Sequence, residues 1–132
     1  MPDALTVDAA AASVGSRTLT IHADDGTPLA ATLFEPTCSV PADAPLIVIG
    51  PAAAVPSRYY TRFAAYLAEH GHPVLTFDYR GIGGSRSGSL RGNPARMRDW
   101  CTLDTPGVIA WAGQEHAGRP LHWVGHSMGG FA

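Results

Sequence analysis

The sequence predicts an α/β fold in which an antiparallel β-hairpin precedes a parallel βαβαβ segment. Two alternating segments around a turn indicate the hairpin over residues 17–34. An apolar run at 46–49 and a further strand at 73–78 enclose a helical pattern at 59–71, which is the order of a βαβ crossover. A further helical segment and a last apolar run at 121–124 continue this alternation up to a tight turn.

The hairpin is indicated by residue alternation and by its turn. Residues 17–23 alternate polar and apolar side chains, as in a strand half exposed to water. The turn at 24–28 contains Gly26, which adopts a positive φ without steric cost, and residues 29–34 form the second strand. Residues 1–15 show no clear period, so we expect a disordered tail at 1–15 and one domain at 16–132.

The crossover is built from two buried strands and one amphipathic helix. The run at 46–49 is apolar and mostly β-branched, which is typical of a strand covered on both faces of a parallel sheet. The pair Tyr59/Tyr60 is spaced with Phe63 and Leu67 along one face of a helix. Ser57 is suited to its N-cap and Gly71 to its C-cap.

A second helix is expected over about 95–116, where Trp100 and Val108 are among the apolar side chains that recur. Pro106 lies inside this segment and removes one backbone hydrogen bond, so the helix should kink or split there. The stretch 118–120 then leads into the last strand.

The last strand runs into the pattern Gly-x-Ser-x-Gly at 125–129, which is typical of a nucleophile elbow. In such a turn the serine, here Ser127, stands between a strand and a helix with its hydroxyl exposed. The flanking Gly125 and Gly129 are small because helix and strand approach closely there. The backbone N–H of Met128 would point at the same place and stabilise an oxyanion.

Composition limits the classes of function. The chain has 132 residues, 45% hydrophobic and 15% charged, as expected of one soluble globular domain. A net charge of −2 favours neither nucleic acid nor an anionic membrane, and no apolar run reaches the length of a membrane span. No basic residue precedes Arg17, so a secretory signal is not expected, and Cys38 and Cys101 are expected to be free thiols of a cytoplasmic protein.

Three stretches in the right order resemble the α/β-hydrolase superfamily over residues 17–132. They are the elbow at 125–129, the loop Asp-Tyr-Arg-Gly-Ile-Gly-Gly-Ser at 78–85, and Gly-Pro-Ala at 50–52, where the family usually has His-Gly. The sequences of the 78–85 loop and of residues 95–100 are most similar to a poorly characterised bacterial branch near the serine aminopeptidase-like hydrolases. The resemblance implies that the chain is the N-terminal part of that fold.

The resemblance also implies a mechanism. Ser127 would attack an ester, thioester or amide carbonyl of a small molecule, with its proton taken by a histidine that an acidic residue orients. Met128 and a residue of the third-strand loop would hold the oxyanion. Pro51 has no N–H, so Ala52 is favoured and Ala53 is the alternative. No cofactor and no metal is expected.

The family order of the triad is Ser, Asp/Glu, His, and only Met128, Gly129, Gly130, Phe131 and Ala132 follow Ser127. The histidines before it (His22, His70, His72, His116, His122 and His126) are expected at surfaces, helix ends or in packing. We therefore expect an N-terminal hydrolase fragment that is inactive by itself. The alternative is a non-catalytic remnant or interaction module. Substrate and oligomeric state stay open.

Three weaker patterns have structural explanations. Glycines 81 and 83 suggest a dinucleotide loop, but the third glycine of that motif would fall at Arg86 and no helix begins there. Asp78 precedes the serine, so bracing of its loop is favoured over a role as catalytic acid. The arginines at 80, 86, 91, 96 and 98 are expected on a solvated loop rather than in an anion site.

Overall fold

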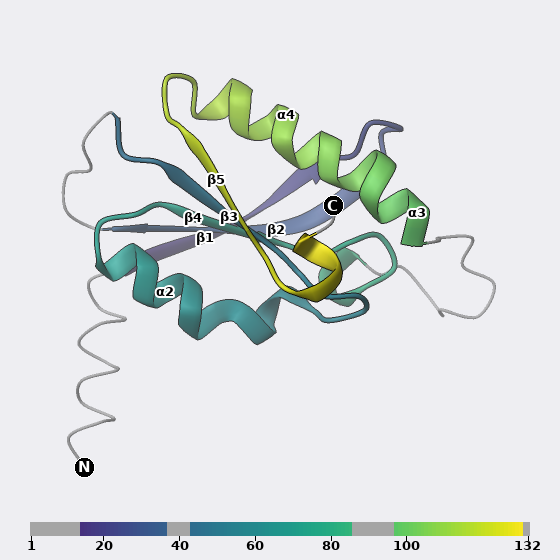
Figure 1. Cartoon of the computed structure of the whole chain (residues 1–132), viewed down its shortest axis with the longest axis horizontal. Coiled ribbons are helices and arrows are strands. Elements are labelled where there is room, and N and C mark those ends of the chain that lie inside the picture. The colour runs from purple at the N-terminus through teal and green to yellow at the C-terminus, as the bar shows by residue number, and fades with distance from the viewer. Residues whose placement is uncertain (1–13, 37–42, 86–96, 131–132) are drawn as a thin grey trace, which may run out of the picture.

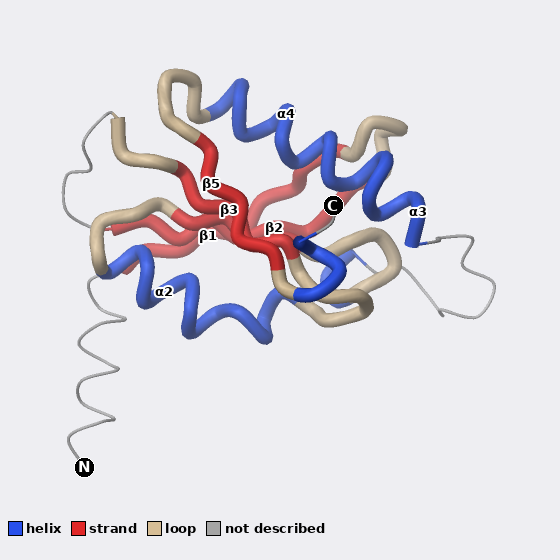
Figure 2. The backbone as a smooth tube through the Cα atoms, in the orientation of Figure 1, coloured by secondary structure: helices blue, strands red, loops and turns tan. Residues whose placement is uncertain are grey.

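A computed structural model describes residues 14–36, 43–85 and 97–130 of the chain. The described residues form one mixed sheet with helices on both faces (Figures 1 and 2). The strands are β1 (Val14–His22), β2 (Pro28–Pro36), β3 (Leu46–Gly50), β4 (Val74–Phe77) and β5 (Leu121–Gly125). The longer helices are α2 (Thr61–Glu69) and α4 (Thr105–Glu115), and the short helical segments are η1 (Ser57–Tyr60), η2 (Gly83–Ser85), α3 (Met97–Asp99), η3 (Trp100–Asp104) and η4 (Ser127–Gly130).

The sheet has the strand order β1-β2-β4-β3-β5. β1 and β2 form the predicted antiparallel hairpin, and β2 pairs antiparallel with β4. β4, β3 and β5 are parallel to one another, as the two crossovers require. β5 therefore lies at one edge of the sheet, with β3 as its partner.

The side chains of the central strands point alternately into two separate hydrophobic cores, one on each face of the sheet. Leu46 and Val48 of β3 face the layer of α4, whereas Ile47 and Ile49 face the layer of α2. Figure 1 shows α2 on one face of the sheet and α3, η3 and α4 on the other. This double coverage explains why the β3 sequence is apolar without interruption.

The boundary between the predicted tail and the first strand differs from the structure. β1 begins at Val14, three residues before the predicted start, because Val14 and Gly15 pair with Pro36 and Glu35 of β2. The predicted tail is therefore too long by these two residues, and its other residues, 1–13, lie outside the described part. Cys38 and the predicted helix start at 95 also lie outside it.

The second predicted helix is divided just before Pro106. The segment η3 is a π-helical turn, and α4 follows it with Pro106 in the first turn. In this position the missing N–H of proline breaks no regular helical hydrogen bond. The division places Asp104 of the π-turn in the interior, with no exposed surface.

Arg80 ties three loops together around this buried carboxylate. Its backbone N–H and its Nε–H donate to the two oxygens of Asp104, each at 2.8 Å. Its terminal nitrogens reach Asp25 in the hairpin turn, at 2.8 and 2.9 Å. The Arg80 side chain is only 13% exposed, so the solvated position predicted for it is wrong. The other arginines of that run, apart from Arg98, lie outside the described residues.

The helix α4 approaches the hairpin very closely at Gly107. A Cβ at this position would lie 2.6 Å from both the Ala23 Cα and the His22 carbonyl oxygen. Gly113, on the same helix, has nothing within 4 Å of such a Cβ.

In the described part of the chain, no helix is both long and apolar enough to cross a membrane.

We expect Gly107→Ala to destabilise the fold by about 1–3 kcal/mol, because the new methyl group meets backbone that must move. Gly113→Ala is the matched control and should stabilise by up to about 1 kcal/mol, since it improves helix propensity in open space. Urea denaturation of both variants measures the difference. Equal effects of the two substitutions would show that α4 does not sit against the hairpin as described.

Asp104→Asn should destabilise the fold by about 3–5 kcal/mol, because it leaves the Arg80 guanidinium without its buried partner. Asp25→Asn, at the exposed end of the same network, should have a much smaller effect, because solvent screens an exposed ion pair. Thermal unfolding of both variants checks this order, and a larger effect at Asp25 would contradict it.

The same network predicts a pH dependence. The guanidinium of Arg80 holds the pKa of Asp25 well below its ordinary value of 3.8. A lowered carboxyl pKa stabilises the folded state above the ordinary value, and that contribution is lost as the pH falls below it. We therefore expect Asp25→Asn to weaken the acid sensitivity of unfolding below about pH 4, measured as urea midpoints at pH 3 and pH 6. An unchanged difference between the two midpoints would exclude this role of Asp25.

Candidate active site

Ser127 stands on a strained turn at the carboxyl end of β5. It follows His126 directly after the strand and opens the short helix η4. Its φ is +56°, and the only other non-glycine residue with a positive φ in the described chain is Ala54, at +60°. Backbone in this region costs on the order of 1–3 kcal/mol for a residue with a Cβ and is frequent at functional sites. The Ser127 side chain is exposed.

Backbone and side-chain hydrogen bonds hold the turn in place. The His126 N–H donates to the Gly50 carbonyl at the end of β3, at 3.0 Å. The Gly129 N–H donates to the His126 carbonyl at 3.0 Å, which closes the turn around Ser127. The indole N–H of Trp123 donates to the Gly129 carbonyl at 2.7 Å. The serine is thus fixed both to its own strand and to β3.

Close approach of backbone explains the glycine after Ser127. A Cβ on Gly129 would collide with the carbonyl group of Gly50 and would lie 2.9 Å from the carbonyl oxygen of Pro51. A Cβ on Gly50 would in turn collide with the indole of Trp123. The elbow therefore fits against the end of β3 only because both facing positions lack a side chain.

The loop after β3 carries both predicted candidates for the second oxyanion donor. The Val55 N–H donates to the Ala52 carbonyl at 3.1 Å, so residues 52–55 form a turn with Ala54 at positive φ. The Ala52 N–H donates to the Tyr60 hydroxyl at 2.8 Å. The Ala53 N–H has no hydrogen-bond partner within the described residues. Met128, the predicted first donor, follows Ser127 in η4.

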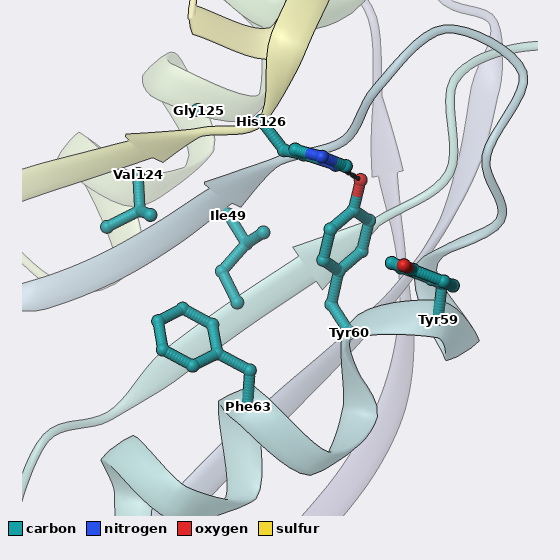
Figure 3. A pocket seen from close by; sticks show the side chains of 7 residues that line it. All are labelled: Ile49, Tyr59, Tyr60, Phe63, Val124, Gly125 and His126. Atoms are coloured by element: carbon teal, nitrogen blue, oxygen red, sulfur yellow. Dashed lines mark hydrogen bonds between the residues drawn. The ribbon is translucent and has the colours of Figure 1, made fainter.

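Tyr60 joins this loop to the elbow. Its hydroxyl lies 2.8 Å from Nδ1 of His126, and the residue is 7% exposed (Figure 3). The sequence indicated only packing for His126, and the polar contact was missed because 66 residues separate the two partners. In the sequence, Tyr60 is only the second of two adjacent tyrosines at the start of the helical pattern, and nothing local indicates His126 as its partner.

A pocket of about 370 Å³ opens beside this contact. It lies between the start of α2 and the end of β5, and Figure 3 shows Phe63, Ile49 and Val124 to the left of the Tyr60–His126 pair. Tyr59, Tyr60, Gly125 and His126 complete its lining. Its walls are mainly apolar, so it favours an apolar group over a charged one.

No histidine of the described residues bonds to Ser127. The Ser127 hydroxyl has no hydrogen-bond partner there. His70 Nδ1 contacts the Tyr66 carbonyl at 2.8 Å, and His116 packs on Trp111, where burial lowers its pKa. His22 and His122 are exposed on strands. The described residues thus present the serine without the base of a triad.

Asp78 braces the neighbouring loops. The residue is 6% exposed, and its carboxylate accepts hydrogen bonds from the Ser57 N–H at 2.6 Å and the Gly84 N–H at 3.0 Å. A Cβ on Gly83 would lie 2.8 Å from this carboxylate. The carboxylate thus holds the 83–85 loop against the start of η1.

Among the described residues, no group of histidine, cysteine or acidic side chains is arranged to hold a metal ion.

The fold is similar to those of several solved hydrolases. A cold-adapted esterase from an Arctic intertidal metagenomic library has 22% identity and a TM-score of 0.64, with 89% of this chain and 52% of that chain covered. The protein Est1E from Butyrivibrio proteoclasticus, solved with ferulic acid, has 26% identity and a TM-score of 0.70, with 85% and 43% covered. An α/β serine hydrolase without a lid from Xanthomonas campestris has 21% identity and a TM-score of 0.66, with 88% and 52% covered.

The chain spans about half the length of these structures. No curated protein sequence matches it. Residues 43–132, well over half of the chain, match the family model described as serine aminopeptidase, S33. The chain therefore belongs to the serine aminopeptidase S33 family and has the mixed sheet of an α/β-hydrolase.

Proposed function

We propose that this chain provides the nucleophile and the oxyanion hole of a serine hydrolase that acts on ester, thioester or amide bonds of small molecules. One observation carries the proposal: Ser127 is exposed at the end of β5 with a strained, positive φ. A serine rarely adopts this conformation unless the surrounding structure imposes it. The membership in a family of serine hydrolases supports the same assignment.

In the proposed reaction the Ser127 oxygen attacks the carbonyl carbon of the substrate. A histidine takes the hydroxyl proton and later gives it to the leaving group, and an acidic residue orients that histidine. The negative oxygen of the tetrahedral intermediate accepts hydrogen bonds from the N–H of Met128 and from an N–H of the loop after β3. Because the described residues bring no histidine to Ser127, we propose that the base and the acid come from polypeptide outside residues 1–132.

A second candidate is a non-catalytic module that binds another polypeptide. It is favoured by the edge strand β5, where Leu121 and Val124 are 37% and 39% exposed. An apolar edge with unpaired backbone groups is a template for a further strand. The two candidates differ in one property, since only a hydrolase needs an activated environment at Ser127.

For residues 1–132 alone, we expect no more hydrolysis of p-nitrophenyl acetate than for the Ser127→Ala variant. A general base contributes about 10²–10⁴-fold to such reactions, and the described residues supply none. Initial rates of purified monomer measure this, with circular dichroism to show that both proteins fold. Turnover that disappears in Ser127→Ala would place a working base within these residues.

The nucleophile itself is tested with a fluorophosphonate probe in the presence of imidazole as an external base. The Ser127 oxygen attacks phosphorus, fluoride leaves, and imidazole takes the proton. We expect Ser127 to be labelled at least about 10²-fold faster than Ser16, an exposed serine on β1, because two N–H groups stabilise the developing charge. Peptide mass spectrometry gives both rates. Equal rates at the two serines would favour the non-catalytic module.

A further inference from the structure

We propose that Tyr60 is a positioning residue for the oxyanion hole: its hydroxyl occupies the Ala52 N–H and leaves the Ala53 N–H as the donor to the oxyanion. The inference rests on the proposed function of Ser127. It adds two residues to that function: Tyr60, which positions the oxyanion hole, and Ala53, whose N–H donates to the oxyanion.

The first step is the direction of the hydrogen bonds at Tyr60. The Ala52 N–H can only donate, so the phenolic oxygen accepts at 2.8 Å. The phenolic hydrogen then has His126 Nδ1 as its partner, also at 2.8 Å. A neutral His126 therefore carries its proton on Nε2. The opposite assignment would leave the hydroxyl hydrogen of a 7% exposed side chain without a partner, which is costly.

The second step is the rigidity of Tyr60. It ends η1 and forms the N-cap of α2, whose Ala64 and Ala68 are fully buried against the sheet. Its ring packs edge-to-face on Tyr59 at 5.2 Å and on His126 at 5.7 Å between centroids. A hydroxyl held by a packed helix fixes the loop after β3 relative to the elbow (Figure 3).

The third step is the choice between the loop donors. Pro51 has no N–H, and the Ala52 N–H is already used by Tyr60. Ala53 follows directly, and within the described residues its N–H has no partner. The positive φ at Ala54 and the bond from the Val55 N–H to the Ala52 carbonyl match a type II turn with Ala53 at its second position. Proline is common at that position, so Ala53→Pro removes the N–H without disturbing the turn.

The experiment compares Tyr60→Phe and Ala53→Pro in the 132-residue chain, with Tyr59→Phe as the matched control. The Tyr59 ring packs on the rings of Tyr60 and His126, and its hydroxyl makes no hydrogen bond within the described residues. Nitrogen-15 spectra of the histidine side chains report the tautomer of His126, and amide exchange reports the Ala52 N–H. Fluorophosphonate labelling with imidazole reports the oxyanion hole.

In Tyr60→Phe we expect His126 to lose its single tautomer and the Ala52 amide to exchange roughly 10-fold faster. Tyr59→Phe should change neither. Ala53→Pro should keep the His126 tautomer and label Ser127 about 10²-fold more slowly. Unchanged histidine spectra in Tyr60→Phe would overturn the role of Tyr60, and wild-type labelling in Ala53→Pro would overturn the donor assignment.

If wild-type Ser127 is not labelled at all, the proposed function fails, and the donor assignment to Ala53 fails with it. The spectra and the amide exchange do not depend on reactivity at Ser127. They therefore still decide whether the Tyr60 hydroxyl joins the loop to the elbow, so the two failures are distinguishable.

Discussion

The parallel pairing of β3 with β5 is the constraint on which the site depends. The register places Gly50 opposite Gly125 at the carboxyl ends of both strands. Since parallel strands end at the same edge of a sheet, the loop after β3 and the elbow after β5 must meet there. The bond from the His126 N–H to the Gly50 carbonyl extends this pairing by one residue beyond β5. A change of register by one residue would separate the elbow from the loop.

This meeting of two turns sets strict limits on side-chain size. Gly50 and Gly129 both face positions where a Cβ would collide, one with the Trp123 indole and the other with the Gly50 carbonyl. Trp123 fills the space that the glycines leave and donates to the Gly129 carbonyl. Its ring also lies 6.1 Å from that of Phe77, which connects the elbow to the core on the α4 side. Packing therefore requires glycine at both positions, whatever the chemistry of the site.

The two strained residues of the described chain, Ala54 and Ser127, lie in these two adjoining loops. Strain of this kind persists only where the surrounding structure over-determines it. Here that structure includes the bonds at Gly50 and Gly129, the Tyr60 hydroxyl and the Asp78 carboxylate, which holds the Ser57 N–H. Two residues after Asp78 in the same loop, Arg80 is held by its hydrogen bonds to the Asp104 carboxylate. Polar contacts between loops therefore position a serine whose own strand lies at the sheet edge.

The sequence alone determined the order of strands and helices, the hairpin, the two crossovers and the Gly-x-Ser-x-Gly turn. These features depend on the period of neighbouring residues and on local steric needs, which a linear pattern records. Only the tertiary structure decided that Tyr60 meets His126 across 66 residues, and that Arg80 reaches Asp104 across 24 and Asp25 across 55. The same holds for the start of β1 at Val14, which requires Pro36 as its partner. Such contacts have no local signal, because the packing of distant segments creates the geometry in which each hydrogen bond forms.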